Sequence, residues 1–155
     1  MAVAVAVAVA VAERALQYKY GVAGSKKLQS FDLVVYSESG NNPLIDVKGR
    51  KHSGQTGRSL QHWVTRDNVS FLEAWSGIFG EGFESAFVFL LWCDSQPPDA
   101  LFLAAFEFNR CWDAVLAVWM GDYVGHVRDH PAKWDPADLS AADFDRVSVR
   151  IKKLL

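Results

Sequence analysis

Two aspartates and a lysine, Asp32, Asp46 and Lys48, are the residues of this 155-residue chain whose types and spacing could carry out chemistry. Two carboxylates suit a hard cation such as magnesium, which proteins bind through one or two carboxylates together with water and substrate phosphate. A bound cation can generate a hydroxide nucleophile and stabilise negative charge on phosphate oxygens. We therefore interpret Asp32 and Asp46 as candidate metal ligands and catalytic residues. Lys48 is a third catalytic candidate, which could hold the water or neutralise the transition state.

These three residues lie on a predicted β-hairpin. Residues 31–37 are rich in β-branched and aromatic side chains, which is typical of a strand. Residues 38–42 contain Ser, Gly and two Asn, which favour a turn. Residues 43–49 form a second predicted strand, which begins at Pro43, where the missing N–H does little harm. The chemistry therefore depends on how the two strands are aligned.

The alignment of the hairpin decides whether the carboxylates meet. A turn centred near Ser39 would place Asp32 directly opposite Asp46. Like charges in that position destabilise a sheet unless something positive lies between them. Lys48 is one candidate for that positive group, since Asp46 and Lys48 share a face of the strand, and a divalent cation is the other.

A small basic segment follows the hairpin and could neutralise a phosphate backbone. Its basic residues are Arg50, Lys51, His52 and Arg58. We expect residues 51–58 to form a loop because they are rich in Gly, Ser and Gln. So small a group of basic residues is equally consistent with a solvated loop that binds no ligand. Gln61 would follow on the first turn of the next helix and could reach the site, although such a Gln is more often simply solvated.

The remaining pattern predicts an α/β fold. A helix is expected over residues 59–79, with an interruption near 65–68 where Thr65 or Asp67 could cap its second part. A continuous apolar run at residues 84–93 is typical of a strand buried on both faces. The later expected elements are strands at 101–108 and 112–120, a short helix at 122–128, and a final helix that Asp138 or Ser140 caps and that ends at Val147.

Composition indicates one folded domain. Half of the residues are hydrophobic and 22% are charged, so the chain can bury a core. The formal net charge of −2 is unlike that of a strong nucleic-acid binder. Residues 1–12 are an Ala-Val repeat that is too short to span a bilayer and lacks a basic start, so we expect a cytoplasmic protein without a membrane segment. Residues 13–155 would form the domain.

Asp32 followed by Asp46-Val47-Lys48 resembles the signature of the PD-(D/E)xK nuclease superfamily, whose members have the restriction-endonuclease-like fold. The resemblance implies a central mixed sheet flanked by helices, and magnesium-dependent cleavage of nucleic acid. It also implies that the Val47 carbonyl could add a metal ligand. Short motifs of this kind also arise by chance.

A longer resemblance covers residues 13–147. The segments LQSFDLVVYS, LIDVKGRKH, LQHWVT, AFVFLLWCDSQPPDALF and FEFNRCWDAVLAV are similar to a bacterial family of unassigned function, the HYExAFE family, which itself looks like a PD-(D/E)xK domain. The His-Tyr-Glu-x-Ala-Phe-Glu motif that names the family is absent, and the Ala-Val repeat stands at the start instead. Nucleases of the superfamily often carry a further acidic residue on that first helix.

Three interpretations follow. The first is a magnesium-dependent nuclease that uses Asp32, Asp46 and Lys48. The second is a non-catalytic relative that binds nucleic acid or a protein, which the acidic net charge and the absent motif favour. The third is an interaction domain in which the D-x-K spacing is a coincidence. Without its first helix the sheet would expose an apolar patch, so we also expect a homodimer or poor solubility.

Overall fold

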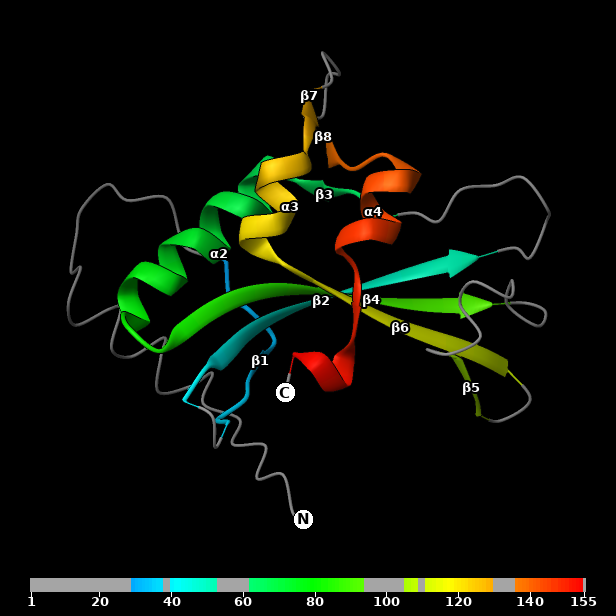
Figure 1. Cartoon of the computed structure of the whole chain (residues 1–155), viewed down its shortest axis with the longest axis horizontal. Helices are drawn as coiled ribbons and strands as arrows, with labels where there is room; N and C mark the ends of the chain where they lie inside the picture. Colours follow the sequence, from blue (N-terminus) through cyan, green and yellow to red (C-terminus); the bar gives the residue numbers. More distant parts are fainter. Residues whose placement is uncertain are drawn as a thin grey trace.

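The computed structural model describes residues 29–37, 40–52, 62–93, 105–108, 111–129 and 136–154. Within these ranges a central mixed sheet has helices packed against it, and a smaller sheet lies beside the helices (Figure 1). This is the α/β class, with a central mixed sheet flanked by helices, that the sequence predicts. No helix in the described ranges is long and apolar enough to span a membrane.

The strands of the two sheets have the following bounds. The central sheet contains β1 (Leu33–Val34), β2 (Asn42–His52), β4 (Phe83–Cys93), β6 (Cys111–Trp119) and β5 (Ala105–Phe108), in that spatial order, and β9 (Val149–Arg150) also pairs with β6. The small sheet contains β3 (Val64–Thr65), β8 (Pro136–Asp138) and β7 (Arg128–Asp129). The helices are α2 (Arg66–Phe79), α3 (Met120–His126), α4 (Ala141–Val147) and the short 3₁₀ helix η2 (Ile151–Lys153).

Strands β2 and β4 are parallel and are joined through α2, which confirms the predicted strand–helix–strand connection. The pairing is long and regular, from Asn42 beside Phe83 to His52 beside Cys93. It places Asp46 beside Phe87. The candidate lysine, two residues further along the strand, therefore lies on the same face of the sheet.

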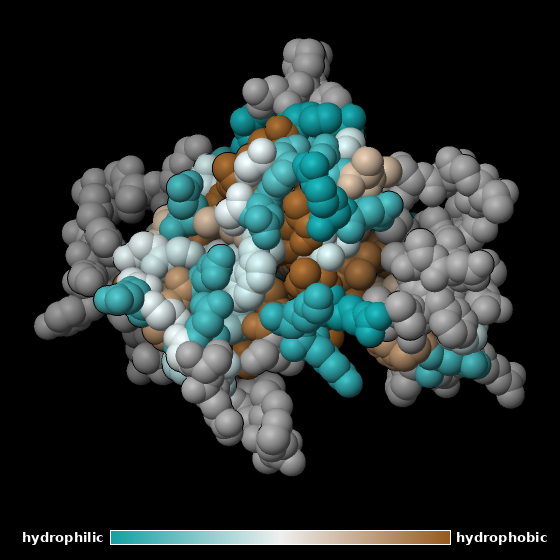
Figure 2. Space-filling model, viewed as in Figure 1, coloured by the Kyte–Doolittle hydropathy of each residue, from teal (hydrophilic) through white to brown (hydrophobic). Residues whose placement is uncertain are grey.

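Strand β4 is buried on both faces over residues 85–89, as its continuous apolar sequence predicts, whereas Leu90 and Trp92 further along one face are exposed. Phe87, Phe89 and Leu91 pack into a core that includes residues of α2, α3 and α4. Ala86 and Val88 point to the opposite face, into a second cluster with residues near the C-terminal end of the chain. Figure 2 shows hydrophilic residues on the outer sides of the helices and hydrophobic residues gathered toward the centre of the view.

Helix α2 corresponds to the second part of the predicted helix, and its N-cap is Thr65, one of the two predicted caps. The expected start at Ser59 falls outside the described residues, and Val64 and Thr65 form strand β3 instead of a helical turn. The physical reason is the capping box at Thr65, whose hydroxyl accepts a hydrogen bond from the Asn68 N–H while the Asn68 side chain accepts one from the Thr65 N–H. The helix ends at Gly80, which has a positive φ of 81°.

Other boundaries also differ from prediction. The first hairpin strand is only Leu33–Val34, because the chain bends at Asp32. Strand β2 continues to His52, so Lys51 and His52 belong to the strand and not to the predicted loop, since β4 supplies a partner along the whole length. The second hairpin and the final helix, which Ser140 caps, are confirmed within the described residues.

Candidate functional site

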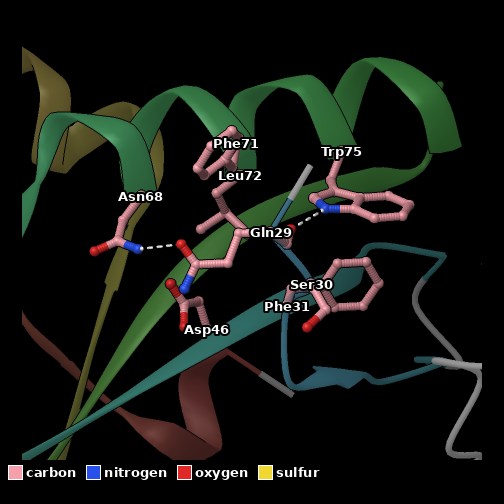
Figure 3. Close-up of a pocket in the computed structure, with 8 residues that line it drawn as sticks. All are labelled: Gln29, Ser30, Phe31, Asp46, Asn68, Phe71, Leu72 and Trp75. Atoms are coloured by element: carbon pink, nitrogen blue, oxygen red, sulfur yellow. Dashed lines mark hydrogen bonds between the residues drawn. The ribbon is translucent and has the colours of Figure 1, made fainter. Parts of the chain in front are cut away.

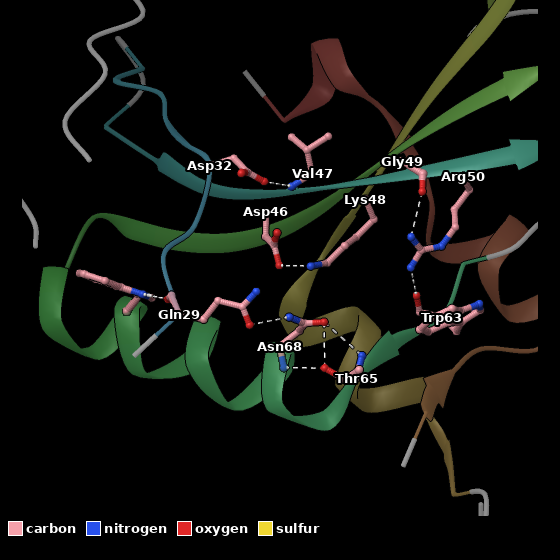
Figure 4. Close-up of polar contacts among 11 residues, drawn as sticks. Gln29, Asp32, Asp46, Val47, Lys48, Gly49, Arg50, Trp63, Thr65 and Asn68 are labelled. Atoms are coloured by element: carbon pink, nitrogen blue, oxygen red, sulfur yellow. Dashed lines mark hydrogen bonds and ion pairs between the residues drawn. The ribbon is translucent and has the colours of Figure 1, made fainter. Parts of the chain in front are cut away.

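The hairpin alignment brings the two aspartates opposite each other. Strand β1 is antiparallel to β2, with Leu33 paired to Ile45 and Val34 paired to Leu44. Continued by one residue, the same alignment places Asp32 across from Asp46. This is the register that a turn centred near Ser39 predicts, although residues 38 and 39 lie outside the described ranges. Figure 4 shows both side chains beside β2.

Asp32 is held by two successive groups of the β2 backbone. Its N–H donates to the Ile45 carbonyl at 2.9 Å, and its Oδ2 accepts from the Val47 N–H at 2.7 Å. The side chain therefore takes the place that a strand partner of Val47 would occupy. This contact uses one of the two carboxylate oxygens, and Asp32 is an exposed residue.

Asp46 forms an ion pair with Lys48 on the same face of β2. The Lys48 Nζ lies 2.8 Å from the Asp46 Oδ2, and the two side chains are only 14% and 13% exposed. Burial raises the pKa of Asp46 above its ordinary value, and the nearby Asp32 carboxylate raises the pKa further, while Lys48 lowers it. Burial therefore outweighs the ion pair with Lys48 in its effect on the pKa of Asp46.

The acidic pair can hold a hard cation with a small number of protein ligands. Within the described residues no group of three His, Cys, Asp or Glu side chains could hold a metal ion, so the described carboxylates could supply at most two ligands. In a β-strand the N–H and C=O of one residue point toward the same neighbouring strand. The Val47 carbonyl therefore faces the same side as the N–H that Asp32 binds. Two carboxylates and one carbonyl are oxygen ligands that fit magnesium, which keeps several waters.

A pocket lies between Asp46 and helix α2 (Figure 3). Its apolar wall is formed by Phe31, Phe71, Leu72 and Trp75. Its polar residues are Gln29, Ser30, Asp46 and Asn68. The Trp75 indole N–H donates to the Gln29 carbonyl at 2.9 Å, which fixes the segment before β1 against the helix. One side of the acidic pair is therefore a walled recess and not open surface.

Sequence reasoning did not identify Gln29 or Asn68 as site residues. The spacing of Thr65 and Asn68 contains a usable signal, because an acceptor three residues after a Thr is typical of a capping box. Nothing in the sequence places Gln29 beside Asn68, since that contact joins residues 39 positions apart.

Two of the basic residues predicted to bind nucleic acid, Arg50 and Lys51, lie on opposite faces of β2. The Arg50 guanidinium donates to the carbonyls of Gly49 (2.9 Å) and Trp63 (2.8 Å) and lies 4.5 Å from the Trp63 ring centre. Burial lowers the pKa of Arg50. Lys51 points to the opposite face, with its Nζ 5.2 Å from the ring centre of the half-exposed Trp92.

Two other predicted residues, Arg58 and Gln61, lie outside the described residues, as does the side chain of His52. Their proposed contacts with nucleic acid stay predictions. The structure thus brings together the three residues predicted to be catalytic, Asp32, Asp46 and Lys48, and separates Arg50 from Lys51.

No protein-family model matches the sequence, and no curated protein matches it, so membership of the HYExAFE family stays a prediction. The chain is similar in structure to Hjc of Archaeoglobus fulgidus, a Holliday junction resolvase from an archaeal hyperthermophile. The two are 15% identical, the match covers 92% of this chain and 95% of the other, and the TM-score is 0.48. A similarity this low assigns neither a fold family nor a function to this chain.

Proposed function

We propose that this protein is a magnesium-dependent nuclease that hydrolyses phosphodiester bonds at the acidic pair. Asp32 and Asp46 would hold the cation, with the Val47 carbonyl as a third protein ligand. The observation that carries the proposal is the placement of two like charges across one hairpin, at the edge of a walled pocket, with a lysine 2.8 Å from one of them. Such an arrangement is unfavourable unless a cation compensates it.

Each residue of the site has a distinct part in this chemistry. A bound magnesium supplies a Lewis acid and lowers the pKa of a coordinated water. Asp32, anchored on the Val47 N–H through Oδ2, offers its other oxygen as a ligand in a fixed position. Lys48 can move its ammonium group from Asp46 toward a water or a phosphate oxygen, since lysine is a flexible point charge. The low exposure of both side chains strengthens these interactions.

Basic residues near the site would contact the phosphate backbone. Arg58 and Gln61 are the residues that we propose for this role. Lys51, whose side chain lies on the opposite face of β2 from Asp46 and Lys48, would contact phosphate away from the acidic pair. Arg50 is a weaker candidate for phosphate, because its guanidinium already donates to two carbonyls. Its loss would instead be expected to disturb the position of the segment before β3.

A second candidate function is a non-catalytic domain that binds nucleic acid or a protein. The ion pair between Lys48 and Asp46 favours it, because that pair neutralises one carboxylate without a cation. The net charge of −2 favours a protein over nucleic acid as the partner of such a domain. The two functions differ in whether the acidic pair takes up a divalent cation.

Calorimetric titration of magnesium or manganese into the protein tests the metal site. We expect the parent chain to bind, and Asp46→Asn and Asp32→Asn each to weaken binding by at least roughly tenfold. The Asn side chain at position 32 can still accept from the Val47 N–H, so this variant isolates the charge. Asp145→Asn is the matched control, because Asp145 lies exposed on α4, and it should bind as the parent does.

A cleavage assay then separates the two functions. Single- and double-stranded DNA and RNA are incubated with the protein and magnesium, and products are resolved on a denaturing gel. We expect cleavage that Asp46→Asn and Lys48→Ala abolish. Absence of metal binding in the parent chain, even with phosphate present, would rule out the nuclease and leave the non-catalytic domain.

A further inference from the structure

We infer that the Gln29 carboxamide is a hydrogen-bond donor of the acidic site, and that the capping box of helix α2 fixes which end of this amide faces Asp46. The inference rests on the proposed function, and assigns its donor to an anionic oxygen of a phosphodiester or of the attacking water. It concerns residues that the metal site itself does not include.

The orientation of the Asn68 amide is set by the Thr65 backbone N–H, which can only donate a hydrogen bond. The Thr65 N–H donates to the Asn68 Oδ1 at 3.2 Å, and the Thr65 hydroxyl donates to the same oxygen at 2.9 Å. A backbone N–H has no lone pair to offer, so the oxygen end of the Asn68 amide must face Thr65. The nitrogen end of Asn68 must therefore face away from the helix start.

The orientation of the Asn68 amide fixes the orientation of the Gln29 amide. The Asn68 Nδ2 donates to the Gln29 Oε1 at 3.3 Å. Since Gln29 presents its oxygen to Asn68, its NH₂ group is left on the other side. Figure 3 shows this nitrogen pointing toward the Asp46 carboxylate, and both residues line the same pocket.

The backbone of Gln29 is held as firmly as its side chain. Its carbonyl accepts from the Trp75 indole N–H at 2.9 Å, so both ends of the residue are tied to α2. A donor held in this way needs little reorganisation when negative charge develops nearby, which is the property that favours a transition state. Gln29 would therefore be a catalytic residue that donates to an anion beside Asp46 and Lys48, and Asn68 is the residue that positions it.

Four variants separate this role from a structural one. Gln29→Ala removes the amide, and Gln29→Glu keeps its size but removes the donor. Asn68→Asp keeps an acceptor for the Thr65 N–H, as a carboxylate does in a capping box, but can no longer donate to Gln29. The Gln29 amide should then turn its nitrogen toward position 68. Ser70→Asp adds the same charge on the exposed face of α2 and is the matched control.

The first measurement does not need activity. In the NMR spectrum of the parent chain we expect contacts (NOEs) between the Gln29 side-chain NH₂ protons and the Asp46 Hβ protons, and their loss in Asn68→Asp with the melting temperature unchanged or raised. Absence of these contacts in the parent chain would overturn the inference, whether or not the protein is a nuclease.

The second measurement is the magnesium-dependent cleavage rate. We expect Gln29→Ala and Asn68→Asp to lower kcat on the order of ten- to a hundredfold, with metal affinity and KM changed much less, because a hydrogen bond to a charged group is lost. Gln29→Glu should lower kcat as well, and its added carboxylate should also change the metal affinity. Ser70→Asp should cleave at the parent rate. Parent rates in the Gln29 variants would refute the role of Gln29 and leave the nuclease standing. If the parent shows the NMR contacts but neither binds metal nor cleaves, the nuclease and the assigned catalytic role fail together, and only the orientation of the amide stands.

Discussion

Asp32 and Asp46 each have one carboxylate oxygen held by a neighbouring group. The Asp32 Oδ2 accepts the Val47 N–H, and the Asp46 Oδ2 lies beside the Lys48 Nζ. Both carboxylates are therefore oriented by the fold, which would lower the entropy lost when the cation that we propose binds.

His62 is the residue that should make stability depend on pH. It is only 5% exposed, its ring stacks on Phe144 with centres 4.4 Å apart, and its buried Nδ1 has no hydrogen-bond partner among the described residues. Burial lowers the pKa of His62 below its ordinary value of 6.5; Asp138 and Asp145 oppose this shift, and Arg128 adds to it. The folded chain thus binds fewer protons at this site than the unfolded chain.

The sign of the effect follows from that difference. Stability from His62 is fully present above pH 6.5 and is lost as the pH falls from 6.5 toward the depressed pKa of the folded state. Urea unfolding at pH 7.5 and pH 5.5 should show a smaller free energy of unfolding at the lower pH. In His62→Phe that decrease should shrink, whereas in His126→Gln, at the end of α3, it should persist. An equal decrease in all three proteins would contradict the prediction.

At this scale the sequence predicted that Asp32 lies opposite Asp46, but not which residues surround them. Strand alternation and turn composition were sufficient to place Asp32 opposite Asp46, because a hairpin is local. Gln29 and His62 could not be found in this way, since their partners Asn68 and Phe144 are distant in sequence. The contact between Arg50 and Trp63 could not be predicted from the sequence either, because it depends on where the segment before β3 lies relative to β2.

At the scale of the elements, Gly77 and Gly82, on either side of the end of α2, differ in whether the position tolerates a side chain. Gly77 lies exposed in the helix, and a Cβ there would meet nothing within 4 Å. Gly82 has a φ of +83°, and a Cβ there would lie 3.3 Å from the Gly40 carbonyl oxygen. Only Gly82 therefore needs to be glycine.

Alanine substitutions at these two positions should change stability in opposite directions. Gly77→Ala should raise the free energy of unfolding by about 1 kcal/mol, since alanine has the higher helix propensity. Gly82→Ala should lower it by roughly 1–2 kcal/mol, because a left-handed conformation is unfavourable for a residue with a Cβ. Urea denaturation of both variants is the measurement, and destabilisation by Gly77→Ala would show that α2 is not regular at this point.

Element types were predicted better than element limits. The buried strand β4 and the crossover through α2 followed from a continuous apolar run and from helical spacing. The first part of the predicted helix was wrong at Val64 because the periodicity of Leu60, Trp63 and Val64 resembles a helix, whereas Val64 pairs with Ala137 in the small sheet. That partner lies 73 residues further along the chain, where sequence periodicity cannot report it.

At the scale of the whole molecule, Tyr123 connects the two sheets. Its ring packs against Phe87 and Phe89 of the central sheet, with centres 5.1 and 6.4 Å away. Its hydroxyl lies 2.8 Å from the His62 carbonyl and 2.7 Å from the Ala137 carbonyl, next to the small sheet. Burial raises the pKa of Tyr123, so this hydroxyl stays a donor throughout the neutral range.

Tyr123→Phe should keep the ring packing and remove the hydrogen bonds of the hydroxyl to the His62 and Ala137 carbonyls. The free energy of unfolding should fall by about 1–2 kcal/mol, since two buried carbonyls lose their shared donor. Tyr36→Phe is the matched control: Tyr36 is 53% exposed, and its loss of a hydroxyl should change stability by less than about 0.5 kcal/mol. Equal effects of the two substitutions, measured by thermal unfolding, would show that the hydroxyl does not connect the sheets.

The outer edge of β2 affects the tendency of the protein to aggregate at high concentration. In the described residues β1 pairs with only Leu44 and Ile45, so the rest of that edge could accept a strand from another chain. Asp32 accepts the Val47 N–H, and Arg50 donates to the Gly49 carbonyl, so charged side chains occupy positions that an incoming strand would need. Charges on an edge strand oppose intermolecular pairing and aggregation. The aspartate that we propose for metal binding, Asp32, therefore also opposes strand pairing between the sheets of two molecules.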